Sequence, residues 1–313
     1  MTWMNEAAAL LSLGLIVAVL ALTYYFSNQV LNIRTHSNDA ILSFELDGGR
    51  ITKEQFEQLP KELVGFDSPF GYRLHAWFVP STRGTTDRTV VFAHGVTSSL
   101  VGMLKYADMF RRRGFNVLLY DHRRHGLSGG KHTTYGYYEK HDLKAAVDWV
   151  YRRLGSSAVV GIFGESMGAA TALQYAAIDE RPDFIVADCP YSDLTEQLAY
   201  RLRVQYGLPR FPLLPMTSLW CKLRAGFYFH EVSPLTDVAR VRTPILFAHG
   251  EADAFVPKWM SLALYERKSG AKDLYLAPNA AHAEAWAANR DAYERKLDEF
   301  LRAHSLLKEA VGV

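Results

Sequence analysis

The chain has 313 residues, of which 49% are hydrophobic, so it is long enough to bury a large core in one globular domain. Its formal net charge of +2, with 22% charged residues, gives no indication of a nucleic-acid partner. Two cysteines, Cys189 and Cys221, are too few for a disulfide framework, and the sequence has no H-E-x-x-H or C-x-x-C metal spacing.

The N-terminal segment differs in kind from the rest of the chain. Residues 7–26, AAALLSLGLIVAVLALTYYF, carry no charge, and as a helix they would span about 30 Å, the thickness of a bilayer's hydrocarbon core. Tyr24 and Tyr25 end the stretch as interfacial aromatic residues would. A cleaved signal peptide is the alternative, but no basic residue precedes the stretch and no clear A-x-A site follows it. We therefore expect a single-pass membrane anchor over residues 1–30, and Arg34 favours a cytoplasmic position for the domain that follows.

After a connector over residues 31–60, which has some strand or helix character, the pattern becomes that of a folded domain over residues 61–313. Strands are predicted at 62–80 (two strands with a turn at 68–71), 89–95, 116–121, 159–164, 184–190, 244–250 and 273–278. Helices are predicted at 100–113, 141–154, 167–178 and 289–304. This alternation predicts an α/β fold, with a mostly parallel central sheet covered by helices on both faces. In such sheets the catalytic groups lie at the carboxyl ends of the strands.

One stretch, at about residues 191–233, breaks the alternation of strands and helices. It holds a Gly- and Pro-rich segment at 207–215 between two helical patterns, and it is rich in Leu, Phe, Tyr and Trp. An ordinary connection between a strand and the next is much shorter. The stretch therefore predicts a small helical cap over the site.

The pentapeptide Gly-Glu-Ser-Met-Gly places Ser166 where a buried strand turns into a helix. Gly164 and Gly168 remove the side chains that would clash in so tight a turn. Such a turn lifts the serine hydroxyl above the sheet, at a helix N-terminus whose free N–H groups favour developing negative charge. The alternative is a flexible turn with a solvated serine, because this pattern also arises by chance. The flanking strand and helix favour a nucleophile, and Glu165 is expected to make a local polar contact.

Acyl transfer needs a base within reach of the hydroxyl and a carboxylate that orients the base. His282 follows the last predicted strand and is the expected base. Asp253, three residues past the preceding strand, is the expected acid, and Glu251 in the same loop is the alternative. His94 and His249 each precede a glycine at a strand end, where we expect structural hydrogen bonds.

An oxyanion hole needs two backbone donors that point at one position. The N–H of Met167, directly after the serine, is one candidate. The N–H of Val96, in the loop HGVTSS after an early strand, is the other, and Gly95 would allow the loop to approach closely. A simple turn is the alternative interpretation of that loop.

Five stretches, in this order along the chain, resemble motifs of the α/β-hydrolase fold serine hydrolases: HGVTSS, YDHRRHGLSGG, GESMG, HGEADAFVP and AAHAEAW. From about Phe66 to the C-terminus the chain looks most like the bacterial membrane-anchored branch, which is related to monoglyceride lipases and to the hydrolase domains of prolyl oligopeptidase-type enzymes. The resemblance implies a catalytic triad, two oxyanion donors and no cofactor. The implied residues are Ser166, Asp253 and His282 for the triad and Val96 and Met167 for the donors. The chain departs from many relatives at Arg124, where they have glycine, which leaves the shape of that loop open.

A serine nucleophile argues against dehalogenase and epoxide hydrolase chemistry, which normally use an aspartate there. We therefore expect hydrolysis of carboxylic esters through an acyl-enzyme. An apolar cap beside a membrane anchor suits a small-molecule or lipid-derived ester with an apolar acyl group. The alternatives are an amidase or peptidase of the prolyl oligopeptidase type, and a non-catalytic, membrane-tethered binding protein on a hydrolase scaffold, because a fold alone does not determine function.

Overall fold

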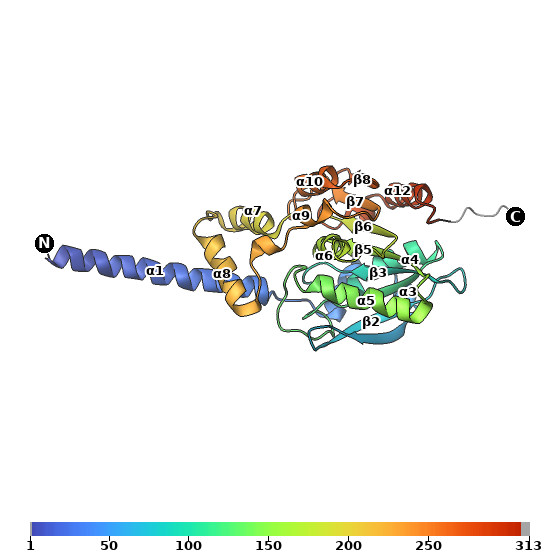
Figure 1. Cartoon of the computed structure of the whole chain (residues 1–313), viewed down its shortest axis with the longest axis horizontal. Helices are drawn as coiled ribbons and strands as arrows, with labels where there is room; N and C mark the ends of the chain where they lie inside the picture. The colour runs from blue at the N-terminus through green and yellow to red at the C-terminus, as the bar shows by residue number, and fades with distance from the viewer. Residues whose placement is uncertain (1, 308–313) are drawn as a thin grey trace.

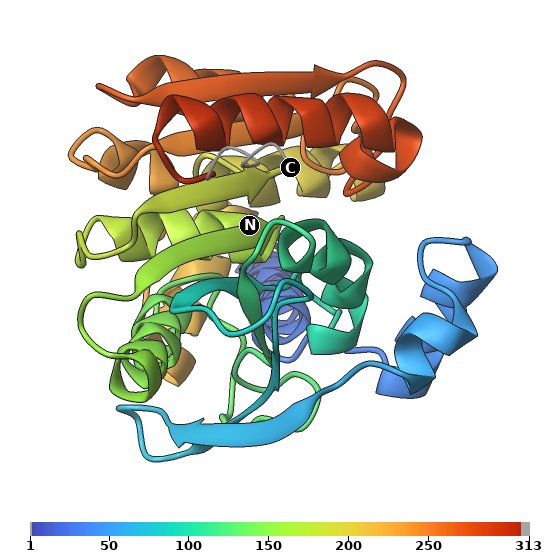
Figure 2. The ribbon, with the colours of Figure 1, turned by 90° about the vertical axis from the view of Figure 1, so that its right-hand side faces the viewer.

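The computed structural model describes residues 2–307, and its centre is an eight-stranded sheet in the order β1-β2-β4-β3-β5-β6-β7-β8. β2 runs antiparallel to both of its neighbours, and all other neighbours pair in parallel. Figure 2 shows the sheet from the orange β8 at the top to the blue strands at the bottom. The strands are β1 Glu62–Asp67, β2 Arg73–Val79, β3 Arg88–Ala93, β4 Asn116–Tyr120, β5 Val159–Glu165, β6 Phe184–Asp188, β7 Ile245–Gly250 and β8 Lys272–Ala277. The mostly parallel sheet predicted from the sequence is confirmed.

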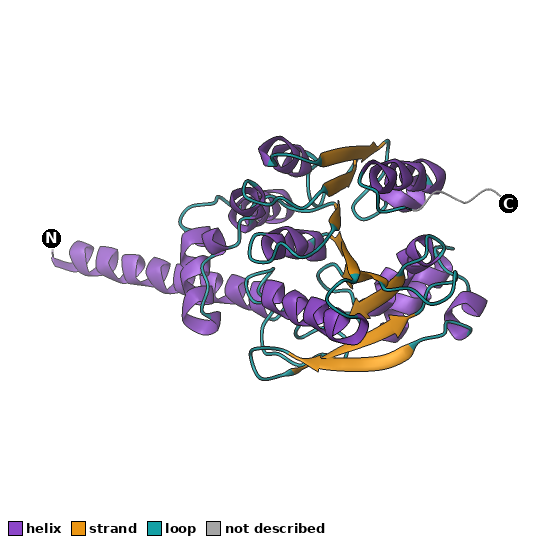
Figure 3. Cartoon of the chain, turned by 45° about the vertical axis from the view of Figure 1, so that its right-hand side comes forward, coloured by secondary structure: helices purple, strands orange, loops and turns teal. Residues whose placement is uncertain are grey.

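Helices cover both faces of this sheet, as the alternating pattern predicts (Figure 3). Along β3, Val90 and Phe92 pack into one core with α4 and α12, while Val91 and Ala93 pack into a second core with α5 and α6. The α-helices are α1 Thr2–Leu31, α2 Asn38–Asp47, α3 Lys53–Glu57, α4 Leu104–Arg111, α5 Glu139–Leu154, α6 Met167–Ala176, α7 Leu194–Tyr206, α8 Leu213–Ala225, α9 Pro234–Val238, α10 Trp259–Arg267, α11 Ala285–Ala288 and α12 Arg290–Ala303. Two 3₁₀ turns lie at Leu100–Met103 and Phe229–Glu231.

The segment expected as a connector, residues 31–60, is folded against the domain. It forms α2 and α3, which begin at the side-chain caps Ser37 and Thr52. Ile41 and Ile51 are buried in the core on the α4 side of the sheet. This segment therefore packs onto the domain that follows it.

Helix α1 has a free part and a packed part (Figure 1). Within residues 2–307, the stretch Trp3–Leu31 is the one helix long and apolar enough to cross a membrane, and the part of it before Thr23 is almost entirely exposed. The packed part begins at Thr23, whose hydroxyl accepts a hydrogen bond from the indole Nε1 of Trp220 in α8 at 3.2 Å. One turn later, Arg224 of α8 donates to the hydroxyl of the buried Ser27 at 2.7 Å.

The residues just beyond α1 are tied to the domain as well. The backbone N–H of Thr133 donates to the carbonyl of Leu31 at 3.0 Å, and the guanidinium of Arg124 donates to the carbonyl of Ile33 at 2.7 Å. Arg124 has a φ of 62°, in the left-handed region that favours glycine. The loop around Arg124 therefore keeps the backbone conformation that glycine would have there. The side chain of Arg124 binds the segment that follows α1.

The predicted cap is present as α7 and α8, which leave the sheet after β6 and return before β7. The Gly- and Pro-rich segment joins these two helices, and α7 ends at Gly207 in the left-handed conformation that glycine adopts most easily. A third apolar cluster includes Val30 of α1, Leu194 and Leu214 of the cap, and Met167 of α6. The cap, the end of α1 and the start of α6 therefore share one core.

We predict that two N-terminal deletions will differ in stability. Deleting residues 1–22 removes only the free part of α1 and should leave the thermal midpoint Tm almost unchanged. Deleting residues 1–36 also removes the buried Val30 and Leu31, and should lower Tm by about 5 °C or more. Thermal unfolding of both proteins in the same detergent-free buffer measures the difference, and equal Tm values would contradict the packing described for α1.

Candidate functional site

Ser166 lies in a strained turn between β5 and α6. Its φ of 54° and ψ of −112° lie in a region that side-chain-bearing residues rarely adopt. The two flanking glycines make the turn possible. A Cβ atom on Gly168 would lie 1.9 Å from the carbonyl oxygen of Ala93, and one on Gly164 would lie 2.5 Å from the Cα of Ala169. The N–H of Ser166 donates to the carbonyl of Asp188 at 2.8 Å, which fixes the turn against β6.

The structure brings Ser166, His282 and Asp253 together in one hydrogen-bonded chain. The Nε2 atom of His282 lies 2.9 Å from the Oγ of Ser166, and its Nδ1 lies 2.6 Å from the Oδ2 of Asp253. An ionised carboxylate can only accept, so the Nδ1 of a neutral His282 carries the proton. Its Nε2 is then free to accept the proton of the serine hydroxyl. The three residues follow β5, β7 and β8, at the same edge of the sheet.

The carboxylate of Asp253 is held on both of its oxygens. Oδ1 accepts from the backbone N–H groups of Phe255 and Val256, each at 2.8 Å, and Oδ2 faces His282 and the Nε2 of His249, the latter at 3.2 Å. Burial raises the pKa of Asp253, but the hydrogen bonds to His249 and His282 outweigh that effect, so the pKa lies well below its usual range. Asp253 is therefore ionised at neutral pH.

His249 makes the structural hydrogen bonds expected from the sequence, and it also contacts the acid. Its ring is completely buried, with Nδ1 2.7 Å from the hydroxyl of Ser261 and Nε2 2.8 Å from the carbonyl of Val256. The additional contact with Asp253 was not anticipated. The four-residue spacing between the two residues within HGEAD is the only sequence signal for it, because both lie in one tight loop.

Glu251, the alternative acid, lies elsewhere. It is exposed and pairs with Lys258 at 3.3 Å, across a contact that solvent screens. Nothing among its described contacts links it to His282. The geometry thus places Asp253, and not Glu251, beside the histidine.

The two expected oxyanion donors lie at the same pocket as the serine. Val96 and Met167 both line the pocket that contains Ser166. Met167 is the first residue of α6, so its N–H has no carbonyl partner within the helix. A Cβ on Gly95 would lie 3.5 Å from the Cβ of Ser166, which shows how closely the loop after β3 passes the serine.

Buried histidines shape this loop. The Nδ1 atom of His94 lies 2.7 Å from the carbonyl oxygen of Gly95. Its Nε2 atom accepts a hydrogen bond from the backbone N–H of His122 at 2.9 Å. The N–H of Thr97 donates to the Nε2 of His125 at 3.3 Å. Burial lowers the pKa of both His94 and His125, so the two rings stay neutral and keep these contacts.

Glu165, beside the serine, belongs to a buried polar network rather than to the site itself. It accepts from the hydroxyl of Tyr106 at 2.9 Å and pairs with the ammonium of Lys105 at 2.8 Å. Burial would lower the pKa of Lys105, but Glu165 and Glu45 raise it above its usual value, so the pair is ionic. The local polar contact expected for Glu165 is present, although its partners come from α4, 59 and 60 residues away in sequence.

Among the residues that the structure describes, one group could offer three atoms to a metal ion: Cys189, Asp253 and His282. Asp253 and His282 already bind each other. Burial raises the pKa of the Cys189 thiol well above its usual value, so the sulfur is protonated and a poor ligand. This chemistry fits the hydrogen-bonded chain better than a metal centre.

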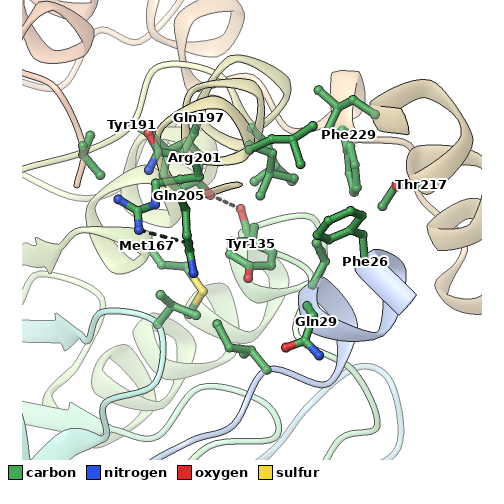
Figure 4. Close-up of a pocket in the computed structure, with 18 of the residues that line it drawn as sticks. Phe26, Gln29, Tyr135, Met167, Tyr191, Gln197, Arg201, Gln205, Thr217 and Phe229 are labelled. Atoms are coloured by element: carbon green, nitrogen blue, oxygen red, sulfur yellow. Dashed lines mark hydrogen bonds between the residues drawn. The ribbon is translucent and has the colours of Figure 1, made fainter. Parts of the chain in front are cut away.

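Ser166 opens into an apolar pocket of about 270 Å³ between the sheet, the cap and the end of α1. Phe26 and Gln29 of α1 face Gln197, Arg201 and Gln205 of α7 across it (Figure 4). The sequence predicted a cap here, but it did not predict that the N-terminal helix would form a wall. Most of the other lining residues are apolar, among them Val30, Leu194, Leu198, Leu202, Leu213, Leu214 and Phe229.

Known proteins resemble this chain in sequence. The profile of the Hydrolase_4 family, described as serine aminopeptidase S33, matches residues 84–208. The Bacillus subtilis protein YqkD is 42% identical over 295 residues, which cover 93% of this chain and 96% of YqkD. The Arabidopsis thaliana α/β-hydrolase domain-containing protein WAV2 is 26% identical over 263 residues, which cover 78% of this chain and 79% of WAV2.

A solved structure supports the same assignment. An esterase of Pyrococcus furiosus superposes with a TM-score of 0.65 at 25% identity, over 80% of this chain and 94% of the esterase. The sheet order, the strained serine turn and these similarities are consistent with each other. The chain belongs to the α/β-hydrolase fold serine hydrolases, in one family with the YqkD protein of Bacillus subtilis.

Proposed function

We propose that this serine hydrolase cleaves carboxylic esters with an apolar acyl group, with Ser166, His282 and Asp253 as its catalytic triad. The observation that carries the proposal is the continuous hydrogen-bonded chain from Ser166 through His282 to Asp253, in which Ser166 lines an apolar pocket. Nucleophile, base and orienting acid are the three groups that acyl transfer requires.

In the proposed mechanism, the Oγ of Ser166 attacks the ester carbonyl while the Nε2 of His282 takes the hydroxyl proton. The imidazolium that forms is stabilised by the ionised Asp253, and it gives the proton to the leaving alcohol. Water, activated by the same histidine, then releases the acid from Ser166. The N–H groups of Val96 and Met167 are proposed to bind the carbonyl oxygen as its negative charge develops.

The pocket favours an ester over the substrate of an aminopeptidase. An aminopeptidase substrate carries a protonated amine, which a carboxylate would hold. Among the described residues that line the pocket, only Arg201 is charged, and it is basic. Its guanidinium lies 4.2 Å from the ring centre of Phe255, and that ring lies 4.9 Å from the ring of His282. A cationic amine would therefore be repelled close to the reacting groups.

We propose that α1 is a retained membrane anchor rather than a cleaved signal. Its last turns supply Phe26, Gln29 and Val30 to the pocket, and Thr23 and Ser27 bind the cap. Cleavage after the apolar stretch at 7–26 would remove Phe26 from this wall and Thr23 from the contact with the cap. The rival function, a non-catalytic binding protein, has less support, because a binding role needs neither the strained serine nor the aligned histidine.

We predict that a fluorophosphonate probe will label the wild-type protein at Ser166. The Ser166→Ala variant should show no labelling and no hydrolysis of nitrophenyl butyrate, while its Tm stays within a few degrees of the wild-type value. Peptide mapping of the labelled protein identifies the site. Labelling at another residue, or unchanged turnover in a folded Ser166→Ala protein, would refute the nucleophile assignment.

The choice of acid gives a second prediction. Asp253→Asn should lower kcat by about 10⁴-fold, because an amide can donate to Nδ1 and so stabilise the wrong tautomer of His282. The matched control Glu251→Gln, two residues away and exposed, should change kcat by less than about twofold, as solvent-screened pairs contribute little. Steady-state kinetics compares kcat of the two variants. A large loss of kcat in Glu251→Gln, with little change in Asp253→Asn, would make Glu251 the acid.

Substrate preference gives a third prediction. For nitrophenyl esters, kcat/KM should rise by roughly fourfold for each added methylene until the pocket is full, since burying one methylene contributes about 0.8 kcal/mol. Nitroanilides of amino acids with a free amine should be much poorer substrates. A maximum at the acetyl ester, or faster cleavage of the aminoacyl anilides, would favour the peptidase alternative.

A further inference from the structure

The pocket lies between the end of the N-terminal helix and the cap. Phe26, Gln29 and Val30 of α1 and Ile33 just after it line one side, and α7 and α8 of the cap line the other. Phe26 meets Tyr206 of α7 in an edge-to-face contact with ring centres 5.3 Å apart. One aromatic pair thus bridges the two elements between which the pocket lies.

The length of the free part of α1 places this pocket at the surface of a bilayer. Residues 3–22 precede the hydrogen bond between Thr23 and Trp220, and twenty helical residues rise about 30 Å, the thickness of the hydrocarbon core. Thr23, where Trp220 binds, then lies at the end of the core. Phe26 and Val30 lie one and two turns further along the helix, at the depth of lipid headgroups.

The cap carries a surface that suits this depth. Leu219 and Leu223 of α8 are 48% and 69% exposed, and Phe211 in the preceding connection is 77% exposed. These three residues do not line the pocket. Tyr24 packs edge-to-face on Trp220 at 5.4 Å, and Arg224 lies 4.8 Å from the Tyr24 ring centre, a combination of aromatic and basic side chains typical of the membrane interface.

We propose that the cap surface of Leu219, Leu223 and Phe211 sits in the bilayer that α1 spans, and that the substrate is a lipid ester which passes sideways from that bilayer into the pocket between α1 and α7. This inference rests on the proposed esterase function and extends it to the substrate's source. The cap helices lie on the side of the domain from which α1 projects (Figure 1). A lipid would keep its acyl chain in apolar surroundings throughout, from the bilayer core to Ser166.

A bilayer is favoured over a protein partner because hydrogen bonds hold the cap against the anchor. The hydrogen bonds of Trp220 to Thr23 and of Arg224 to Ser27 fix α8 at the end of the spanning segment, so its exposed leucines are brought to lipid wherever α1 is inserted. Exposed apolar side chains near such an interface bind lipid in proportion to the apolar area buried.

The test uses the full-length protein reconstituted in phosphatidylcholine vesicles. The substrates are a long-chain monoacylglycerol in the same vesicles and water-soluble nitrophenyl butyrate. The double variant Leu219→Glu/Leu223→Glu should cleave the vesicle substrate at least about tenfold more slowly, because two charges oppose insertion of the cap. Its cleavage of the soluble ester should stay within about twofold of the wild-type rate, as neither residue lines the pocket.

The matched control is Leu63→Glu/Ile178→Glu, at positions 68% and 43% exposed. Leu63 begins β1 and Ile178 follows α6, so both lie at the opposite end of the sheet, and both rates should be unchanged. Equal rates for the cap and control variants on the vesicle substrate would overturn the proposal. So would an equal loss on both substrates, or a change of oligomeric state caused by the cap variant, which would mark a protein interface.

If the two glutamates unfold the cap, the milder double variant Leu219→Gln/Leu223→Gln takes their place. It should also cleave the vesicle substrate more slowly than the wild type, by a smaller factor, while its rate on the soluble ester is unchanged. An equal loss of rate on both substrates would again overturn the proposal. Failure of the esterase function itself looks different. In that case the wild-type protein would cleave neither ester, and Ser166 would not react with the fluorophosphonate.

Discussion

The turn that lifts Ser166 above the sheet requires two very close backbone contacts, which leave no room for a side chain at Gly164 or Gly168. The backbone of α6 lies against the carbonyl of Ala93 at Gly168, and β5 lies against α6 at Gly164. The first of these contacts also sets the position of the loop after β3. The serine and the loop that carries Val96 are therefore held at one separation by the same close approach, and any side chain at Gly168 would disturb both.

The remaining groups of the site reach Ser166 because neighbouring parallel strands end at one edge. In the order β5-β6-β7-β8, the serine follows the first strand, Asp253 the third and His282 the fourth. His282 is 116 residues from Ser166 and 29 from Asp253 along the chain, yet the hydrogen bonds are 2.9 and 2.6 Å long. The rigid sheet supplies this proximity, and two backbone N–H groups and His249 hold the acid in place.

The sequence could predict what depends on local pattern. The strands, the cap, the turn at Ser166 and the loops with Asp253 and His282 each follow from spacing within a few residues. It could not predict what depends on contacts between distant elements, such as the ion pair between Lys105 and Glu165 or the position of Phe26 in the pocket wall. The positions of the short helices α2 and α3 could not be predicted for a related reason. Ile41 of α2 and Ile51, just before α3, gain their burial from the core they join, and a five- or ten-residue helix has little stability alone.

The hydrogen bond from Arg124 to the carbonyl of Ile33 has a consequence for how such chains vary. A left-handed backbone costs a residue other than glycine about 1–3 kcal/mol, so an arginine at this position needs a compensating contact. Here the compensating acceptor lies just after the N-terminal helix. In a relative that lacks this helix, the acceptor is gone and only the strain is left, which favours glycine. We therefore expect the residue at position 124 to differ between domains docked on a preceding helix and domains that stand alone.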